Sequence, residues 1–325
     1  MLEKNSENSF NTHVNLFAPI EPYAQHILDT KDGHLVYYEE CGNPSGIPVI
    51  VLHGGPGGGC NPNMRRYFDP SYYRIILFDQ RGCGKSKPYA SVDNNTTWHL
   101  IKDIELIRIQ LEIGKFFIFG GSWGSTLGLL YAQKYPENVL GMILRGIFTM
   151  TAPELAWFYS KNGVSRFWPE AWREFSDIIP IAERHDLIKA YHDRLFGVST
   201  RDQDKFAIAW TKWENSLATI NSNGAGSAPP THYARAFARI ENHFFINKGF
   251  LDEDHQIMKN MNKISSIKAI IIQGRHDMIC PPHTADELHS NWSNSKLVMI
   301  PASGHAMSEP LISNALIKAT NRFRN

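Results

Sequence analysis

Short, almost wholly apolar runs recur along the first half of the chain and alternate with stretches of helical spacing. The runs read HLVYYEEC, PVIVLHG, RIILFDQ, KFFIFG and VLGMILRG. The later ones are apolar at nearly every position, which is typical of strands buried on both faces of a sheet. Between two of them, TTWHLIKDIELIRIQLEIG predicts a helix that begins after a Thr cap and ends near Gly114. The alternation predicts an α/β fold with a mostly parallel sheet.

The alternation of strand-like runs and helical stretches stops after about Met150 and resumes after about Asp252. The segment between these residues is rich in Trp, Phe, Arg and Glu at helical spacing and has few strand signals. Beyond it come the strand-like runs KAIIIQG and KLVMIPA, with a helical pattern near PPHTADELHSNW between them. We therefore predict one α/β domain that is interrupted by a helical insertion, the cap. The predicted divisions are a polar tail at 1–16, domain segments at 17–149 and 253–325, and the cap at 150–252 with a loop at 221–230.

The composition narrows the classes of protein and partner. The 325 residues carry a net charge of +1 and no sustained run of Lys or Arg, which disfavours a nucleic acid or an anionic membrane as a partner. No apolar run is long enough to span a bilayer, and the first residues, MLEKNSENSFNTH, lack the apolar region of a signal peptide. The four cysteines have neither CxxC nor zinc-like spacing. We expect a cytoplasmic protein with free thiols.

The segment Gly120-Gly121-Ser122-Trp123-Gly124 lies between an apolar run and the helical pattern LGLLYAQKY. In the G-x-S-x-G pattern, small residues allow a sharp turn from strand to helix, and the turn lifts the serine hydroxyl above the sheet. The same residues also fit a glycine-rich turn with a capping serine. The motif alone does not decide between a nucleophile and a cap.

Residues further along the chain favour the nucleophile. A serine hydroxyl needs a base, and the base needs an orienting acid. Asp277 follows the strand-like run IIIQG, and His305 follows the next one, KLVMIPA. The order Ser, Asp, His and the position of each residue after a strand place all three at one edge of a parallel sheet. We predict a catalytic triad of Ser122, Asp277 and His305, and strand spacing favours His305 over His276 as the base.

Backbone N–H groups should hold the oxyanion that forms on the attacked carbonyl. One should come from Trp123, and the other from Gly55 in the loop VLHGGPGGG. That loop lacks the glycine spacing of a phosphate-binding loop. The segment RGCGKS at 81–86 ends in GKS but lacks the earlier glycine, so we interpret it as a turn after a strand.

The motifs HGGPGGG, FDQRGCGKS, GGSWGS, LRGIF and GRHDMICP, in this order, closely resemble those of the proline iminopeptidases of the α/β-hydrolase superfamily. The resemblance runs from about Phe17 to the C-terminal helix. It implies an α/β-hydrolase fold and a serine exopeptidase that removes N-terminal proline from short peptides through an acyl-enzyme intermediate. It implies no organic cofactor and no metal.

The resemblance also implies residues that bind the substrate. A buried ammonium group needs a carboxylate nearby. Glu214 in WTKWENS and Glu241 in FARIENHFF stand in family-like contexts for this role, although either could belong to a solvated helix face or a structural ion pair. Phe148 and Phe245 match family pocket positions and equally suit a core. Cys280, close to Asp277, is either a reactive thiol or an inert one.

Two stretches depart from the family pattern and leave the breadth of substrates open. They are TMTAPELAWF, after RGIF, and LATINSNGAGSAPP in the predicted cap. An alternative function is an esterase or amidase for a small neutral acyl group, which would use the same triad. A further alternative is a catalytically inactive binding protein on this fold. The sequence does not predict an oligomeric state.

Overall fold

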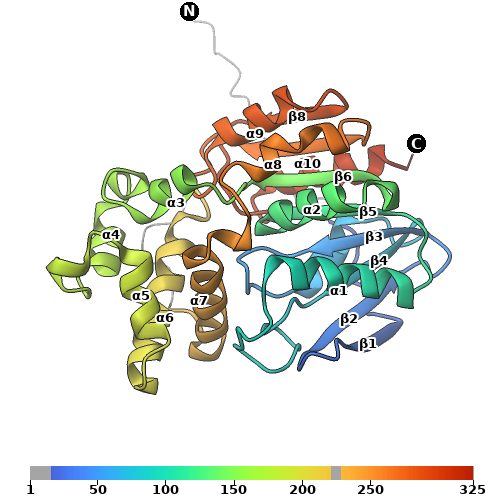
Figure 1. Cartoon of the computed structure of the whole chain (residues 1–325). Helices are drawn as coiled ribbons and strands as arrows, with labels where there is room; N and C mark the ends of the chain where they lie inside the picture. Colours follow the sequence, from blue (N-terminus) through green and yellow to red (C-terminus); the bar gives the residue numbers. More distant parts are fainter. Residues whose placement is uncertain (1–15, 221–227, 325) are drawn as a thin grey trace, which may run out of the picture.

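The computed structural model describes residues 16–220 and 228–324, and within these ranges one sheet of eight strands forms the centre of the molecule (Figure 1). The predicted tail up to residue 15 and most of the predicted loop at 221–230 lie outside the described residues. The strands are β1 (Ala24–Asp29), β2 (Leu35–Gly42), β3 (Ile47–Leu52), β4 (Tyr73–Phe78), β5 (Phe116–Ser122), β6 (Val139–Ile147), β7 (Ala269–Gly274) and β8 (Ser295–Ile300).

The sheet has the order β1-β2-β4-β3-β5-β6-β7-β8. Only β2 runs against its neighbours, and every pair from β4–β3 to β7–β8 is parallel. This confirms the α/β fold with a mostly parallel sheet. The apolar runs form the strands that they predict. β1 (AQHILD) was not predicted as a strand, because it is an edge strand with one solvent-facing side and only partial apolar character.

Helices cover both faces of the sheet (Figure 1). One face carries α1 (Thr97–Gln110), α2 (Trp123–Lys134), α8 (Gln256–Lys259) and α9 (Pro282–Ser290), and the other carries α10 (Pro310–Arg322). α1 begins at the predicted cap, where the side chain of Thr96 accepts a hydrogen bond from the His99 N–H, but it ends before Gly114. α2 is buried from its first residue to Gln133, so it lacks a polar stripe.

Further helices gather on one side of the sheet, at the left of Figure 1. They are α3 (Ala152–Tyr159), α4 (Pro169–Ser176), α5 (Leu187–Leu195), α6 (Thr200–Leu217) and α7 (Thr231–Ile246). They occupy the predicted cap, whose exact boundaries stay a prediction. Short 3₁₀ helices lie at Pro62–Tyr67, Pro136–Asn138, Val164–Arg166, Ile181–Glu183, Lys248–Phe250 and Met261–Ile264. Within the described part of the chain, every helix is too short or too polar to cross a membrane.

The topology creates a crevice at the carboxyl ends of β3 and β5. After β3 the chain passes to β4 on one side, and it then returns to β5 on the other side of β3. Open α/β sheets bind ligands at such a switch point, because the loops that leave the two strands diverge. The loop after β3 contains Gly55, and β5 ends at Ser122. The fold therefore brings the predicted nucleophile and the predicted oxyanion loop to the same crevice.

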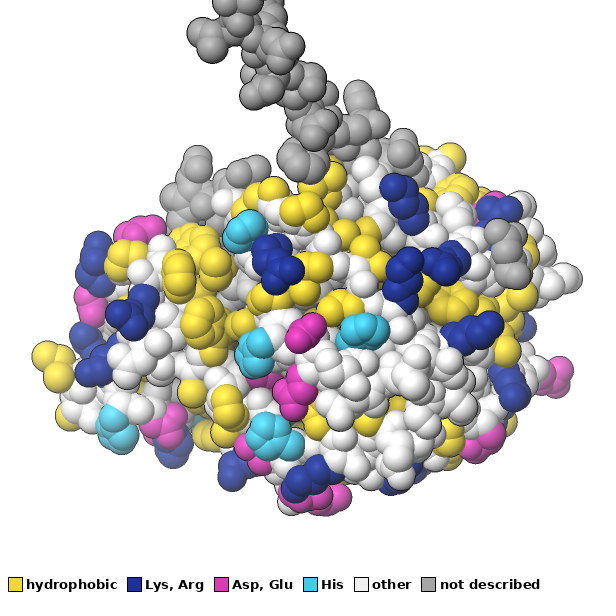
Figure 2. Space-filling view, turned by 90° about the horizontal axis from the view of Figure 1, so that it is seen from above, with side chains coloured by type: hydrophobic (Ala, Val, Ile, Leu, Met, Phe, Trp, Pro, Cys, Tyr) yellow, Lys and Arg dark blue, Asp and Glu magenta, His cyan; other side chains and the backbone are white. Residues whose placement is uncertain are grey.

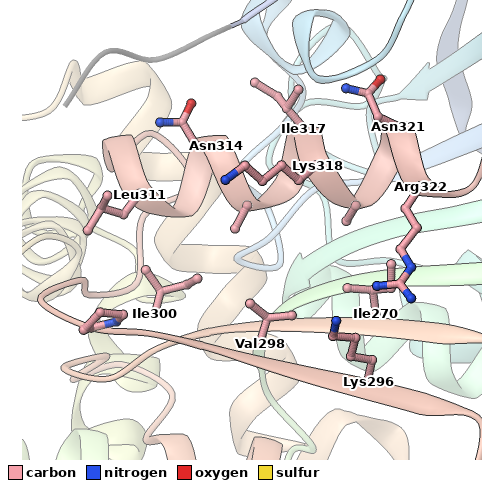
Figure 3. Close-up of a pocket in the computed structure, with 13 residues that line it drawn as sticks. Ile270, Lys296, Val298, Ile300, Leu311, Asn314, Ile317, Lys318, Asn321 and Arg322 are labelled. Carbon is pink, nitrogen blue, oxygen red and sulfur yellow. The ribbon is translucent and has the colours of Figure 1, made fainter. Parts of the chain in front are cut away.

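A large surface hollow lies elsewhere, between β8 and α10. Figure 3 shows Val298 and Ile300 on the floor of this groove of about 750 Å³, with Lys296, Lys318 and Arg322 on its rim. Figure 2 looks onto this side of the molecule and shows hydrophobic side chains exposed between Lys and Arg side chains. None of the predicted site residues lines the groove, so size alone does not identify the site in this molecule.

A buried ion pair fixes the turn after β4. Arg81 donates to both oxygens of Asp103 on α1, at 2.6 and 2.7 Å, and the side chains of both residues are inaccessible to solvent. A second carboxylate, that of Asp32, lies 3.0 Å from the same guanidinium. The segment RGCGKS is thus a turn after β4, as predicted, and its arginine holds it in place.

Asp103→Asn should lower the free energy of unfolding by about 3 kcal/mol, because it leaves the buried Arg81 charge with only the Asp32 carboxylate. Asp29→Asn is the matched control, since Asp29 pairs with Lys31 on the exposed surface. Urea denaturation measures both variants. Equal stability of the two variants would contradict the importance of the buried pair.

Candidate active site

Ser122 occupies a strained turn between β5 and α2. Its backbone has φ 59° and ψ −127°, a conformation that is costly for a residue with a side chain. The residue is 8% exposed and lies at the carboxyl end of a central strand. Backbone strain of this kind persists only where the surrounding structure holds it, and it gathers at functional sites.

The two outer glycines of the motif allow the turn to pack. A Cβ atom at Gly124 would overlap the carbonyl oxygen of Leu52 at the end of β3. A Cβ atom at Gly120 would overlap the carbonyl oxygen of Gly124 itself. At both positions the backbone of the turn packs directly against other backbone atoms. This explains why G-x-S-x-G needs glycine at both ends.

Asp277 and His305 meet on the loops that follow β7 and β8. His305 Nδ1 lies 2.8 Å from Asp277 Oδ2 and 3.0 Å from Asp277 Oδ1. The distances fit a hydrogen bond from the imidazole N–H to the carboxylate. This contact leaves Nε2 as the ring nitrogen available to a nucleophile. Within the described residues, the His276 imidazole has no carboxylate partner. Its backbone N–H donates to the Ser303 carbonyl.

The Asp277–His305 pair lies over the end of β6, next to Ser122. A Cβ atom at Gly146 would be 2.9 Å from His305 Cε1 and 3.2 Å from Asp277 Oδ2. The next residue, Ile147, is the strand partner of Ser122. Among residues 16–220 and 228–324, the Ser122 hydroxyl has no hydrogen-bond partner. Catalytic hydrogen bonds are often long in unliganded enzymes and tighten with substrate.

Asp277 is held in place by several donors. Its Oδ1 accepts from the backbone N–H of Ile279 at 3.1 Å and from that of Cys280 at 2.8 Å. Its Oδ2 accepts from Gln273 Nε2 at 3.2 Å, and the Gln273 Oε1 accepts from the Ile147 N–H at 3.1 Å. Gln273 therefore connects the carboxylate to β6.

The surroundings of His305 favour the neutral imidazole. Burial lowers the pKa of His305 from its usual value, and the Asp277 carboxylate opposes this shift. The nearby Arg145 guanidinium also disfavours imidazolium, and Arg145 Nη1 donates to the His305 carbonyl at 2.6 Å. At neutral pH the ring can therefore accept a proton.

The loop after β3 packs directly against Ser122. A Cβ atom at Gly54 would lie 3.3 Å from the Ser122 Cβ. Gly55 has φ 108°, and within the described residues its backbone N–H has no acceptor. Gln80 ties this loop to α2, because its Nε2 donates to the His53 carbonyl and its Oε1 accepts from Trp123 Nε1, both at 2.9 Å.

A small cavity joins Ser122 to the cap. Both predicted acidic residues line it, as do both predicted phenylalanines and Gly55. The lining residues are Gly55, Ser122, Phe148, Glu154, Leu155, Phe158, Tyr159, Glu214, Glu241, Phe245, Ile279 and Cys280. The structure therefore brings together one nucleophile candidate, three carboxyl groups and a wall of aromatic rings.

Glu214 and Glu241 face each other from α6 and α7. Both carboxyl groups line the cavity, and Trp210 Nε1 donates to Glu241 Oε2 at 2.6 Å. Glu214 is partly accessible as a residue, yet its Oε2 is buried and has no hydrogen-bond partner among the described residues. Burial raises the pKa of Glu214 to about 7 and that of Glu241 well above its usual range. Neither residue is a solvated surface carboxylate.

The apolar wall of the cavity is fixed from two sides. Phe148 follows β6, and α2 holds its backbone: Ser125 accepts from its N–H at 3.2 Å, and Thr126 donates to its carbonyl at 2.7 Å. Its ring meets Phe245 edge to face at 6.0 Å. Cys280 lies in the same wall, where burial raises its thiol pKa well above the usual value and disfavours the reactive thiolate.

Sequence reasoning missed several supporting residues. Gln80 stands in the quoted motif FDQRGCGKS without an assigned role, and Gln273 ends the otherwise apolar run AIIIQG. A polar residue inside an apolar strand was the available signal for Gln273. Trp210 and Tyr159 gave no signal, because aromatic residues in a helical segment also suit a core.

Comparisons with known proteins match nearly the whole chain. A family model for the alpha/beta hydrolase fold matches residues 47–309. The chain is 46% identical to a proline iminopeptidase of Arabidopsis thaliana, over 99% of this chain and 86% of that relative. It is 44% identical to a proline iminopeptidase of Neisseria gonorrhoeae, over 92% of this chain and 96% of that relative.

Solved structures give the same fold. The crystal structure of a proline iminopeptidase from Mycobacterium smegmatis aligns with a TM-score of 0.58 at 19% identity, over 93% of this chain and 99% of that one. The esterase RhEst1 from Rhodococcus sp. ECU1013 aligns with a TM-score of 0.62 at 15% identity, over 94% of this chain and 98% of that one. At such identities the likeness concerns the fold alone.

Gly124→Ala should lower the free energy of unfolding by about 1 to 3 kcal/mol, because the added methyl group overlaps the Leu52 carbonyl. Thermal and urea unfolding measure the loss. Gly114→Ala is the matched control, since a Cβ atom there meets nothing within 4 Å. A Gly124→Ala protein as stable as this control would show that the turn does not depend on close backbone packing.

Proposed function

The chain belongs to the proline iminopeptidase family of α/β hydrolases, and from this membership we propose that it is a serine exopeptidase that releases N-terminal proline from short peptides. One observation carries the proposal beyond the family name. The cavity that reaches Ser122 also reaches three carboxyl groups, of which Glu214 and Glu241 are not engaged in capping a helix, and it has aromatic walls. A free amine and a proline ring are the chemical features that such a cavity would recognise.

Ser122 is the proposed nucleophile. Its hydroxyl attacks the prolyl carbonyl while His305 Nε2 takes the proton, and the Asp277 carboxylate stabilises the imidazolium that forms. The tetrahedral intermediate collapses to a prolyl-enzyme ester as His305 returns the proton to the leaving amine. Water then enters, His305 deprotonates it, and hydrolysis of the ester releases proline.

Gly55 and Trp123 are the proposed oxyanion donors. The Gly55 N–H is unpaired within the described residues, as a donor reserved for a transition state should be. Trp123 begins the helix that follows the nucleophile, so its N–H points from a helix N-terminus toward developing negative charge. Gln80 would fix the positions of the two donors relative to each other. It bonds both to His53, in the loop that contains Gly55, and to the indole of Trp123.

Glu214 and Glu241 are the proposed binding site for the substrate amine, and Phe148 and Phe245 the walls of the proline slot. The pairing of two carboxyl groups without an internal cation has no evident structural benefit, since burial of such a pair is unfavourable. An ammonium ligand would supply the missing charge. The cytoplasmic location expected from the sequence stays a prediction.

Ser122→Ala should reduce turnover of a prolyl amide by about 10⁶-fold, because it removes the nucleophile of the triad. Initial rates at saturating substrate test this. Ser71→Ala, on an exposed turn before β4, is the control and should keep the rate of the unmodified protein. A Ser122→Ala protein with near-normal turnover would exclude the mechanism.

Glu241→Gln should lower kcat/KM for a free prolyl amide by about 10-fold to 100-fold, the worth of a hydrogen bond to a charged group. Hydrolysis of a small neutral ester should change little, because the ester has no ammonium to bind. The two substrates are compared on the same protein preparation. Equal losses on both would favour an esterase or amidase for neutral acyl groups.

A further inference from the structure

We propose that Glu214 and Glu241 share a proton in the free enzyme and exchange it for the ammonium group of the substrate, so that substrate binding releases a proton. The inference rests on the proposed function, because it assigns a charge state to the proposed amine site. It adds a coupling between binding and proton release.

The burial of the pair favours at least one proton. Both carboxyl groups line the same small cavity. Two ionised carboxylates in one small buried site repel each other strongly, and a proton on one of them removes this repulsion. The indole N–H of Trp210 is a single neutral donor, and it bonds to Glu241. Within the described residues, the buried Glu214 Oε2 has no hydrogen-bond donor.

The surroundings supply no charge that could replace the proton. Neither glutamate takes part in an ion pair within residues 16–220 and 228–324. Tyr159 lines the cavity from α3, and Tyr233 lies on α7. Burial, reinforced by both glutamates, raises the pKa of each tyrosine. Cys280, from the loop after β7, has a raised thiol pKa as well. These three groups are neutral near pH 7.

The remaining carboxyl group of the cavity is already satisfied. Glu154 on α3 accepts hydrogen bonds from the backbone N–H groups and the hydroxyls of Thr149 and Thr151. It caps its own helix and has no need of a ligand. The unsatisfied acceptor capacity of the cavity is therefore concentrated in Glu214 and Glu241.

A prolyl ammonium group has what this pair lacks. As a secondary ammonium it carries one positive charge and two N–H donors, one for each carboxylate. The exchange balances: a carboxylic acid and a carboxylate plus R₂NH₂⁺ give two carboxylates bound to R₂NH₂⁺ plus H⁺ in solution. Only an O–H bond breaks, and the proton leaves to water.

The exchange makes amine binding depend on pH. The raised pKa values of the pair mean that protons compete with the ammonium group at and below neutral pH. Affinity for a substrate with a charged amine should therefore rise as pH increases through about 7, until the amine itself loses its proton. A substrate without an amine should not follow this dependence.

The test is a calorimetric titration of full-length Ser122→Ala with prolinamide at pH 6.5, where the ligand amine is charged, in buffers with different heats of ionisation. The dependence of the observed heat on the buffer gives the protons released, and we expect at least one for each prolinamide bound, because pH 6.5 lies below the pKa of Glu214. Glu241→Gln in the same background should release about one proton fewer. Glu170→Gln, in the exposed first turn of α4, is the matched control and should release as many as the parent.

Binding of prolinamide without proton release, or with proton uptake, would overturn the inference. Release that is undiminished in both Glu241→Gln and Glu214→Gln would overturn it, as would failure of prolinamide to bind Ser122→Ala. These outcomes are distinct from failure of the proposed function, which hydrolysis of prolyl amide by the unmodified enzyme measures separately. Absence of that hydrolysis would overturn the proposed function, whatever the titration shows.

Discussion

The close approach of the β5–α2 turn to the end of β3 is the constraint on which the rest of the structure depends. Gly124 touches the Leu52 carbonyl so closely that no side chain fits between them. This contact sets Ser122 at a positive φ and aims α2 at the crevice. The same end of β3 leads into the Gly55 loop. One backbone contact thus places both the proposed nucleophile and a proposed oxyanion donor.

The charges of the site are divided between two environments. Around Asp277 every oxygen has donors, from two backbone N–H groups, from Gln273 and from His305. Around Glu214 and Glu241 donors are scarce, and one buried oxygen has no donor in the part of the chain that the structure describes. The first environment suits an acid that stays ionised and holds a histidine in position. The second suits a site that is completed by a cationic ligand.

The sequence predicted the fold and the Asp277–His305 contact for a physical reason. Parallel strands end at one edge of a sheet, so residues that follow strands in the order Ser, Asp, His meet there. Glu214 and Glu241 came from the family resemblance alone, because helical spacing does not tell which faces of two cap helices oppose one another. β1 was missed because an edge strand with one solvated face has no continuous apolar run. Gln80 and Gln273 were missed because their role is defined only by partners distant in sequence.

The central claim is that Ser122 chemistry is coupled to recognition of a charged amine by the Glu214–Glu241 pair. The most direct measurement is the rate of hydrolysis of a free prolyl amide beside its N-acetylated twin, which differs mainly in the charged nitrogen. We predict cleavage of the free form alone. Cleavage of both at similar rates would contradict it, because the two buried carboxyl groups would then have no part in choosing the substrate.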